Sequence, residues 1–437
     1  MKCNAEVSIK ALCVVFFGLL GAHGIAVALP EPAQDVNQGQ SGYEKLPEFG
    51  GPESVSRQLK QADEDRAAMY RFDGLQRNLA PYFNWKRRIN DEYGIALGFQ
   101  FYALYQDASS SLVGRDDNAS GNIFRFLGSW KALDLGNGNI GRIEWRIESR
   151  SNMFGNQAPG SLGGATGIAT LAPGFAYSDN FDLDLPVINW TQGFASGRAG
   201  FAVGRLDFAA YLDAFPFQTF SRGFINRSFV VNPALATTGT GAIGAVVKGF
   251  VSDTVWLGAQ LHDANAVSGD FDWDTVQEGE WLKALEIGYT PSFERRKTHL
   301  AQFTYWEKDA RNIAGTPAGS GWVVSAAYDL GNGILPFIRL GHSDGGGGAA
   351  AESAVSAGVE ITTRFDQRWS VGAGWAEPSE RTYGPGLDNE TVVETSYSFQ
   401  LSKNFSLTPD LQVVFNPAND PGENSVWIGG IRMIITI

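Results

Sequence analysis

Arginine and glutamate alternate with apolar residues over 142–150, where the chain reads RIEWRIESR. Successive side chains of a β-strand point to opposite faces, so a strand here places every charged residue on one face. Guanidinium groups donate hydrogen bonds and carboxylates accept them, which suits sugar hydroxyls. If the apolar face meets lipid, the charged face points into a barrel. We therefore predict that a substrate path is lined by Arg142, Glu144, Arg146, Glu148 and Arg150, together with Arg125, Glu286 and Arg339.

Both signs of charge occur in this row, so it predicts no simple preference for anions or cations. The plainer alternatives are ion pairs that fill a small barrel and an ordinary porin with a mixed-charge lining. A wide barrel keeps a water-filled channel. We then expect water to reach these side chains, so that their ion pairs add at most about 1 kcal/mol to stability.

Histidines raise the alternative of a barrel-mounted enzyme. His262 precedes Asp263, and His342 precedes Ser343 within a Gly-x-Ser-x-Gly pattern over 341–345. Neighbours on a strand point to opposite faces, and a nucleophile elbow needs a helix after its serine, where this chain has glycines. The acidic loop over 263–280 lacks EF-hand spacing and is expected to be solvated. We predict no catalytic residue, no cofactor and no metal site, and hence a protein that is not an enzyme.

Composition narrows the class of protein. Of 437 residues, 53 are glycine, 12 % are aromatic and only 19 % are charged, which excludes a disordered chain and a coiled coil. The formal net charge is −13, whereas a nucleic-acid partner requires a basic surface. We therefore expect no nucleic-acid partner.

The first 28 residues resemble a secretory signal peptide. Lys2 and Lys10 form a positive start, an apolar stretch follows, and residues 26–28 form a small-x-small cleavage site. Both cysteines, Cys3 and Cys13, lie in this segment, so we expect a mature chain without thiols.

Residues 29–93 are polar and rich in turn-forming residues. Within them, 53–68 has the composition of a helix with a sparse apolar stripe of Val55, Leu59 and Ala62. We expect a tether or a short surface helix here, before a barrel domain over 94–437.

From residue 94 onward the chain is a series of short segments with period-2 alternation, which is typical of strands. Each has about the 9–11 residues that a tilted strand needs to cross a bilayer. The sixteen predicted strands are 94–106, 122–133, 141–150, 186–194, 198–206, 241–251, 254–262, 281–290, 297–308, 321–329, 334–342, 353–363, 369–377, 391–401, 405–416 and 426–437.

The connections between these segments alternate in length. Tight turns such as 136–139, 196–197 and 331–333 alternate with long loops such as 151–185 and 207–240. Short turns on one side, long loops on the other and an even strand count are the plan of an outer-membrane barrel. We predict an all-β fold, a 16-stranded antiparallel transmembrane β-barrel with short periplasmic turns and long extracellular loops, in contact with outer-membrane lipids.

Alternation also predicts which side chains face lipid. In the last segment, Trp427 and Ile431 share a face opposite Arg432. Near residue 205 the alternation breaks down, because Arg205 has the same parity as Val203, and its direction stays unassigned. An apolar outer face on every strand is required in lipid, where closure satisfies every backbone group.

Several motifs between about residue 70 and residue 437 carry a resemblance to a known family. They are GNIFRFLGSW at 121–130, VGRLD at 203–207 with YLD at 211–213, FVVNP at 229–233, GEWLKALEIGY at 279–289, ETSYSFQLSKNFSLTPDLQVVFNPA at 394–418, SVW at 425–427 and Arg432. These motifs resemble the carbohydrate-selective porins of Gram-negative outer membranes, the OprB family, and the block over 394–418 is the most specific.

The resemblance implies passive diffusion of glucose and related sugars, with monosaccharides or small oligosaccharides as partners and the outer-membrane assembly machinery as a second partner. It implies that the Arg/Glu row over 142–150 corresponds to the row of arginine and glutamate side chains that lines the channel in this family. It also implies a possible homo-oligomer. Ile437 departs from the aromatic residue with which such proteins usually end. The alternative is a general or organic-acid-permeable porin on the same barrel.

Overall fold

The computed structural model describes part of the chain, and the predicted signal peptide over 1–28 lies outside that part. The described residues are 43, 50–64, 66–174, 181–219, 221–270, 273–312 and 314–437. Among them, no helix is both long and apolar enough to cross a membrane.

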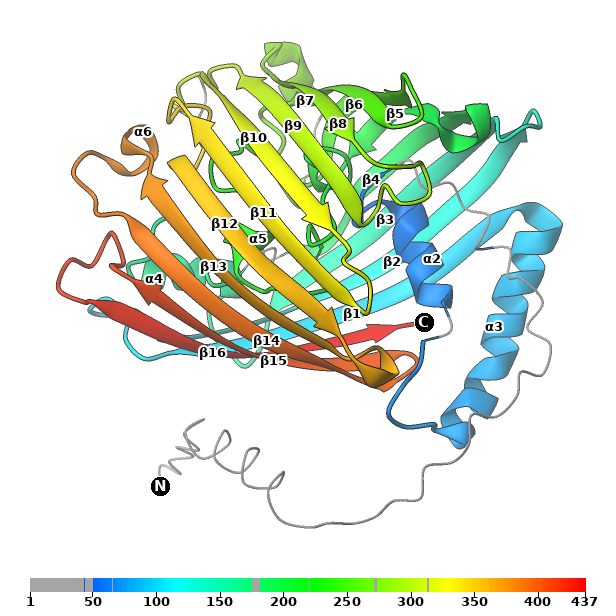
Figure 1. Cartoon of the computed structure of the whole chain (residues 1–437), viewed down its shortest axis with the longest axis horizontal. Coiled ribbons are helices and arrows are strands. Elements are labelled where there is room, and N and C mark those ends of the chain that lie inside the picture. Colours follow the sequence, from blue (N-terminus) through cyan, green and yellow to red (C-terminus); the bar gives the residue numbers. More distant parts are fainter. Residues whose placement is uncertain are drawn as a thin grey trace. The chain divides into compact units, whose positions relative to one another are not determined.

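Sixteen antiparallel strands form one closed barrel, in which each strand pairs with its neighbours in sequence and β1 pairs with β16 (Figure 1). The predicted fold is confirmed, and each predicted strand overlaps one observed strand. The strands are β1 Ile95–Ala108, β2 Asn118–Asp134, β3 Ile140–Asn152, β4 Phe181–Phe194, β5 Ala199–Leu206, β6 Ala242–Phe250, β7 Val255–Asp263, β8 Trp281–Tyr289, β9 His299–Lys308, β10 Gly319–Tyr328, β11 Ile334–Ser343, β12 Ala351–Thr362, β13 Arg368–Pro378, β14 Glu390–Ser402, β15 Phe405–Phe415 and β16 Ser425–Thr436.

The largest differences from the predicted strand limits are at the long-loop ends of β2 and β4. β2 begins at Asn118 rather than 122, and β4 at Phe181 rather than 186. The added residues include Asn118, Ser120 and Asp184, which are polar. Backbone pairing continues through them although they break the apolar alternation on which the prediction relied.

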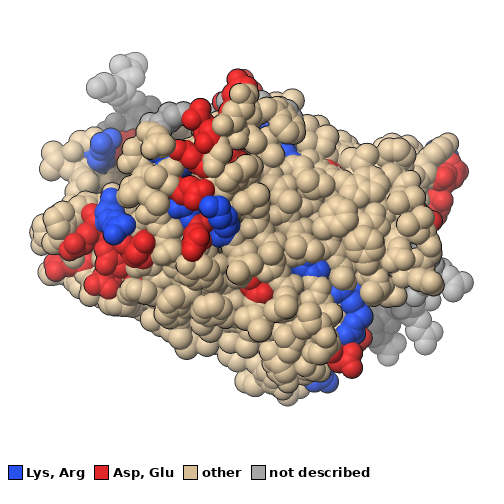
Figure 2. Space-filling view, turned by 90° about the horizontal axis from the view of Figure 1, so that it is seen from above, with Lys and Arg blue, Asp and Glu red and all other residues tan. Residues whose placement is uncertain are grey.

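The two faces of the barrel wall differ as the alternation predicts. On β8, the outward Leu285 is 62 % exposed, whereas the inward neighbour Glu286 is 4 % exposed. Many charged side chains on the face shown in Figure 2 gather toward its left end, and wide areas elsewhere on this face are uncharged. Such uncharged areas suit a lipid environment.

Five helices are described besides short 3₁₀ segments. The two longer ones precede the barrel, and the three four-residue helices lie in long loops. They are α2 Val55–Asp63, α3 Asp73–Tyr93, α4 Leu162–Ala165, α5 Arg227–Val230 and α6 Glu380–Tyr383.

Helix α2 is buried against the inner wall, so the expected surface helix is wrong. Its Val55 and Leu59 form a buried cluster with Ala96 of β1 and Leu127 of β2. Gly98 provides the space, because a Cβ there would lie 3.0 Å from Leu59 Cδ2. The apolar stripe seen in the sequence is real, but it faces the lumen wall.

Helix α3 runs beside the barrel and leads directly into β1 (Figure 1). It ends at Gly94, whose φ of 70° is the left-handed conformation that glycine adopts without strain. Its Tyr82 ring lies 6.5 Å from the ring of Phe99, on the outward face of β1. The helix therefore packs on the outside of the wall that α2 covers from within.

Candidate functional site

The charged row of β3 points inward, with all five side chains buried. Arg142, Glu144, Arg146, Glu148 and Arg150 are at most 4 % exposed. Glu148 is the centre of the row, because its carboxylate lies 2.6 Å from Nε of Arg150, 3.3 Å from Nε of Arg146 and 2.6 Å from Nε of Arg125 on β2. One carboxylate thus faces three guanidinium groups.

The acids that balance this excess of positive charge come from outside the strands. Arg146 Nη2 lies 2.7 Å from Asp207, at the start of the loop over 207–240. Arg125 Nη1 lies 2.8 Å from Glu53, which lies two residues before the start of α2 at Val55. The prediction missed both acids. A signal for Asp207 was present, since an acid beside the apolar residues Leu206 and Phe208 needs a buried partner.

The segment around α2 uses further polar contacts with the same row. Thr219 donates to Glu53 Oε1 at 2.7 Å, and Ser56 donates to Glu144. Gly51 N–H donates to Ala210 O at 2.6 Å. Residues 50–63 and the loop over 207–240 therefore cover the charged row together. The expectation that water reaches these side chains is wrong for this structure, and their role as a substrate path stays a prediction.

Arg339 of β11 holds the middle of the loop over 207–240. Its guanidinium donates to Asp213, to Ser325 Oγ at 3.1 Å and to Val230 O at 3.1 Å. Gln302 of β9 donates to the other oxygen of Asp213 at 2.8 Å. The loop leaves the barrel wall after β5 and reaches β9, β10 and β11, so it crosses the lumen.

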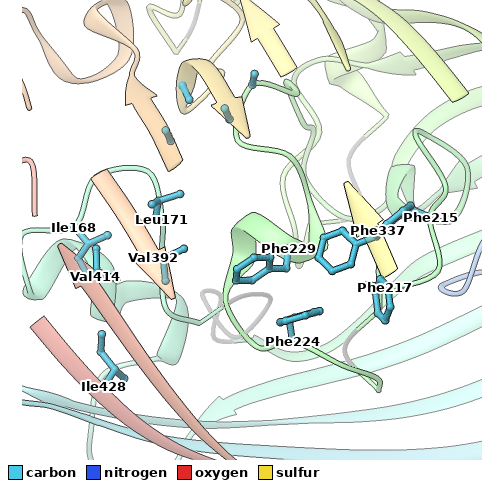
Figure 3. Packing of buried hydrophobic residues seen from close by; sticks show 14 of the residues in the cluster. Ile168, Leu171, Phe215, Phe217, Phe224, Phe229, Phe337, Val392, Val414 and Ile428 are labelled. Atoms are coloured by element: carbon cyan, nitrogen blue, oxygen red, sulfur yellow. The ribbon is translucent and has the colours of Figure 1, made fainter. Parts of the chain in front are cut away.

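Four phenylalanines of this loop pack around one phenylalanine of the wall. Phe215, Phe217, Phe224 and Phe229 have ring centroids 5.0–6.3 Å from that of Phe337 on β11 (Figure 3). All five are buried. Aromatic pairs in this range add to the stabilisation from burial. The loop therefore has an apolar core of its own inside the barrel.

The far end of the loop is fixed by charges on β12, β14 and β16. Arg222 donates to Glu360 at 2.7 Å, and Glu394 accepts from Ile225 N–H at 2.6 Å. Arg432 donates to Gly223 O at 3.1 Å. A carboxylate or guanidinium that satisfies buried backbone groups in this way replaces the water they lose.

A second inserted segment follows β3. Glu390 of β14 accepts hydrogen bonds from the backbone N–H groups of Ala169, Thr170 and Leu171 at 2.7–3.0 Å. Pro173 O accepts from Gln412 at 2.9 Å. The lumen therefore holds α2 and two loop segments, which narrow it.

Arg205, whose direction the sequence left open, is buried and points inward. It lies 2.8 Å from Asp184 and donates to Gly241 O at 2.7 Å. The preceding Gly204 has φ of 137°, which L-residues rarely adopt, and this irregularity reverses the parity of the strand.

Glu286 lies apart from the β3 row, on β8, with β4 to β7 between the two. It contacts Lys248 Nζ at 2.5 Å, Trp256 Nε1 at 3.0 Å and Thr304 Oγ1 at 3.3 Å. The structure thus divides the predicted lining residues into three groups, around Glu148, around Arg339 and around Glu286.

The residues of the enzyme alternative have structural partners. His262 lies 3.1 Å from Gln260, and Ser343 donates to Ala351 O at 2.7 Å. Ser343 is buried whereas His342 is exposed, so they lie on opposite faces. Within the described ranges, no group of three or more His, Cys, Asp or Glu residues is arranged to hold a metal ion.

The acidic loop is less solvated than expected, because its two ends are buried. Asp263 accepts from Asn265 N–H at 2.9 Å, and Glu280 accepts from Asn265 Nδ2 at 2.8 Å. Asp274 and Glu278 between them are exposed.

Comparison with known proteins agrees with this geometry. "Porin AaxA" of Chlamydia felis is 24 % identical over 317 residues, 70 % of this chain and 68 % of that protein. "Porin AaxA" of Chlamydia abortus is 22 % identical over 232 residues, so the match spans 48 % of either chain, about half the length of that relative.

The solved structure of Pseudomonas putida OprB at high pH superposes with a TM-score of 0.65 at 11 % identity, covering 82 % of this chain and 97 % of that one. This likeness shows a common fold. Residues 322–437 match the family model described as carbohydrate-selective porin, OprB family. The resemblance seen in the sequence is thereby confirmed: the chain is a closed porin-type β-barrel, and its residues 322–437 are similar to the OprB family.

Proposed function

We propose that this protein is an outer-membrane porin of a Gram-negative cell that lets carbohydrates diffuse passively down their gradients. Monosaccharides and small oligosaccharides are the proposed substrates. Outer-membrane lipids and the assembly machinery are the other proposed partners, and a homo-oligomer is an open possibility of the same proposal.

The family match over 322–437 carries this proposal. The closed barrel supports a channel, since sixteen strands enclose an interior wider than side chains alone fill. The inserted segments supply selectivity, because a narrowed lumen discriminates by size and hydrogen bonding. Arginine, glutamate and glutamine side chains on the inner wall offer both donors and acceptors to hydroxyl groups.

A liposome-swelling assay tests the proposal. Liposomes with the purified full chain should swell in isotonic glucose and more slowly in a trisaccharide, whereas liposomes without protein should not swell. A planar bilayer should show a small salt conductance that millimolar glucose reduces. A large conductance unaffected by sugars would contradict sugar selectivity.

The second candidate is a porin permeable to organic acids, which the basic residues around Glu286 favour. Arg198, Arg296 and Lys297 lie around the same pocket as the Lys248–Glu286 ion pair, and Arg198 also pairs with Asp253 at 3.0 Å. Swelling in gluconate compared with swelling in glucose separates the two candidates.

A further inference from the structure

Residues 69–93, which include α3, run beside the barrel at the end formed by the short connections (Figure 1). They begin at the end of β14, where Tyr70 N–H donates to Leu401 O at 3.1 Å. They end at Gly94, directly before β1. This stretch therefore passes β15 and β16, which lie between β14 and β1 in the barrel.

Two ring contacts fix the depth and the rotation of α3. The Tyr82 ring lies 6.5 Å from the Phe99 ring, whereas the Phe83 ring lies 5.9 Å from Nζ of Lys403, in the turn between β14 and β15. Phe99 is four residues past the start of β1. For a strand tilted by about 40°, this places it roughly 10 Å toward the middle of the wall. One side of α3 thus faces the middle of the wall and the other faces the short turns.

Large apolar side chains of this stretch are exposed although α3 packs on the barrel. Trp85 is 39 % exposed and Tyr93 is 63 % exposed, and Tyr70, Phe72 and Leu75 are 49–54 % exposed. A surface helix in water normally turns such residues toward the core. Apolar side chains gathered on a surface mark a place of interaction.

The exposed rings continue an aromatic belt on the barrel wall. Trp130 of β2 pairs with Ile95, next to the end of α3, and is 42 % exposed. Trp369 of β13 pairs with Tyr397 of β14 and is 45 % exposed. Both tryptophans point outward near short turns, where a transmembrane barrel has an aromatic girdle at the membrane–water interface. The lipid-facing surface of the wall is therefore continuous with the exposed side of residues 69–93.

The charge of this stretch also suits a phospholipid surface. From 71 to 93 it carries five basic residues against three acids, a net charge of +2 in a chain whose net charge is −13. The basic residues are Arg71, Arg77, Lys86, Arg87 and Arg88, and the acids are Asp73, Asp91 and Glu92. The four arginines are exposed. An arginine on an interfacial helix reaches lipid phosphate with its head group while apolar neighbours enter the boundary of the acyl chains.

We propose that α3 is an interfacial helix that lies in the phospholipid headgroup layer of the membrane leaflet next to the short turns. The side that carries Tyr82 and Trp85 faces the acyl chains. The side that carries Phe83 and Arg87 faces the water beyond the turns. The inference rests on the proposed function, because it requires a barrel that spans the outer membrane.

Spin labels at two positions of α3 test this placement in the full chain. Replacing both native cysteines by alanine first makes each introduced cysteine unique. Asn78→Cys lies seven residues before Trp85 and reports the side proposed to face lipid. Gln76→Cys lies seven residues before Phe83 and is the matched control on the other side, since both positions are exposed.

Two further labels give the reference values for lipid and for water. Leu285→Cys lies on the outward face of β8, and Val113→Cys lies at a fully exposed loop position after β1. In vesicles of phosphatidylethanolamine and phosphatidylglycerol, power saturation compares collisions of each label with oxygen, which concentrates in lipid, and with a water-soluble nickel chelate. The oxygen-to-chelate ratio at Asn78 should be severalfold above that at Gln76, and should lie between the two reference values.

A second variant tests whether the exposed ring holds the helix at this depth. Trp85→Ser should lower the ratio of the Asn78 label toward that of the Gln76 label. Trp369→Ser is the control, since this tryptophan is similarly exposed at the same end of the barrel. It should leave the ratio at Asn78 unchanged.

Equal ratios at Asn78 and Gln76 would place α3 in water and overturn the proposal. Mutual broadening of the Asn78 labels of two copies would mean that a second chain covers the helix, which also overturns it. If Leu285 is protected from the chelate while Asn78 is open to it, the placement of α3 alone is removed. A Leu285 label open to the chelate would instead remove the proposed membrane-spanning function, and this inference with it.

Discussion

Individual charged residues of the barrel wall hold the inserted segments, α2 and the two loop segments, in the lumen. Glu148 faces three arginines, two of which take their second acid from Glu53 and Asp207 on the inserted segments. Burying a charge is costly unless a partner compensates it. The charged wall and the inserted segments therefore depend on each other.

This dependence changes what replacing Arg146 should do. Arg146→Ala leaves Asp207 without its partner at 2.7 Å and removes one cation from Glu148. Breaking a buried pair by removing one partner typically costs about 3–5 kcal/mol. Urea unfolding of the reconstituted protein, followed by fluorescence, should show a destabilisation of this size.

The control for Arg146→Ala is Lys131→Ala, which removes a cation paired with Asp134 on the surface, where the two side chains are 40 % and 46 % exposed. It should cost less than about 1 kcal/mol. Equal unfolding midpoints for both variants would mean that water reaches Arg146 after all.

Ile147→Arg tests the opposite face of the same strand. Ile147 faces outward on β3, and an arginine at the bilayer midplane costs about 2–4 kcal/mol. The variant should reduce the yield of assembled barrel in lipid vesicles. Normal assembly of this variant would place the register of β3 one residue off.

At the scale of elements, the inserted helix α2 is anchored near its start by Glu53. Glu53→Ala removes the ion pair with Arg125 and the hydrogen bond from Thr219. A loss of about 3 kcal/mol raises the open population of α2 by about 10²-fold. Single-channel conductance in a planar bilayer should increase and fluctuate more.

Glu64→Ala is the matched control, since Glu64 also carries a carboxylate on this segment but is exposed. Its conductance should equal that of the unmodified protein. An unchanged conductance for Glu53→Ala would show that α2 does not limit the pore.

Helix α3 offers a pH test, because Lys86 is buried beneath the rings of Tyr43, Tyr82 and Phe83. Burial lowers the pKa of Lys86 to about 8 from 10.5, with Asp63 opposing the shift and Lys403 adding to it. Between pH 8 and 10.5, Lys86 is mostly protonated when α3 is undocked and mostly neutral when α3 is docked. Docking of α3 therefore becomes more stable as pH rises.

Tryptic cleavage at Arg71 and Arg77 should therefore slow between pH 7.5 and 9.5 relative to Lys86→Met, which lacks the titrating group. Tyr82, whose burial raises its pKa to about 12, stays neutral in this window. Parallel cleavage rates for both proteins would exclude a role for Lys86.

The barrel elements were predictable and the inserted ones were not, for a physical reason. Strand periodicity follows from one face in lipid, a constraint that every strand shares. Helix α2 has an apolar stripe of only Val55, Leu59 and Ala62. Such a narrow stripe is compatible with packing on the lumen wall and with packing on the protein surface. Glu53, just before this helix, pairs with Arg125, which is 72 residues away in the sequence. No local sequence pattern encodes that pairing.

At the scale of the molecule, the barrel closes where β1 pairs with β16, and β1 extends beyond the paired part. β1 begins at Ile95, but its pairing with β16 begins only at Gln100. Tyr43 Oη accepts from Leu97 N–H at 2.9 Å and donates to Leu97 O at 3.1 Å, and Ile437 pairs with Phe99. An open strand edge can pair with another chain. The contacts of Tyr43 and Ile437 cover the edge of β1 that β16 leaves unpaired.

Closure predicts how the whole protein unfolds. Because every strand is paired on both sides, opening one pair exposes backbone groups that detergent cannot satisfy, so the barrel should unfold as a unit. In dodecyl sulfate the unheated protein should migrate as a compact band that shifts only after boiling, with a far-UV spectrum dominated by β-structure before heating. A helical spectrum, or a gradual shift that begins at low temperature, would contradict a closed barrel.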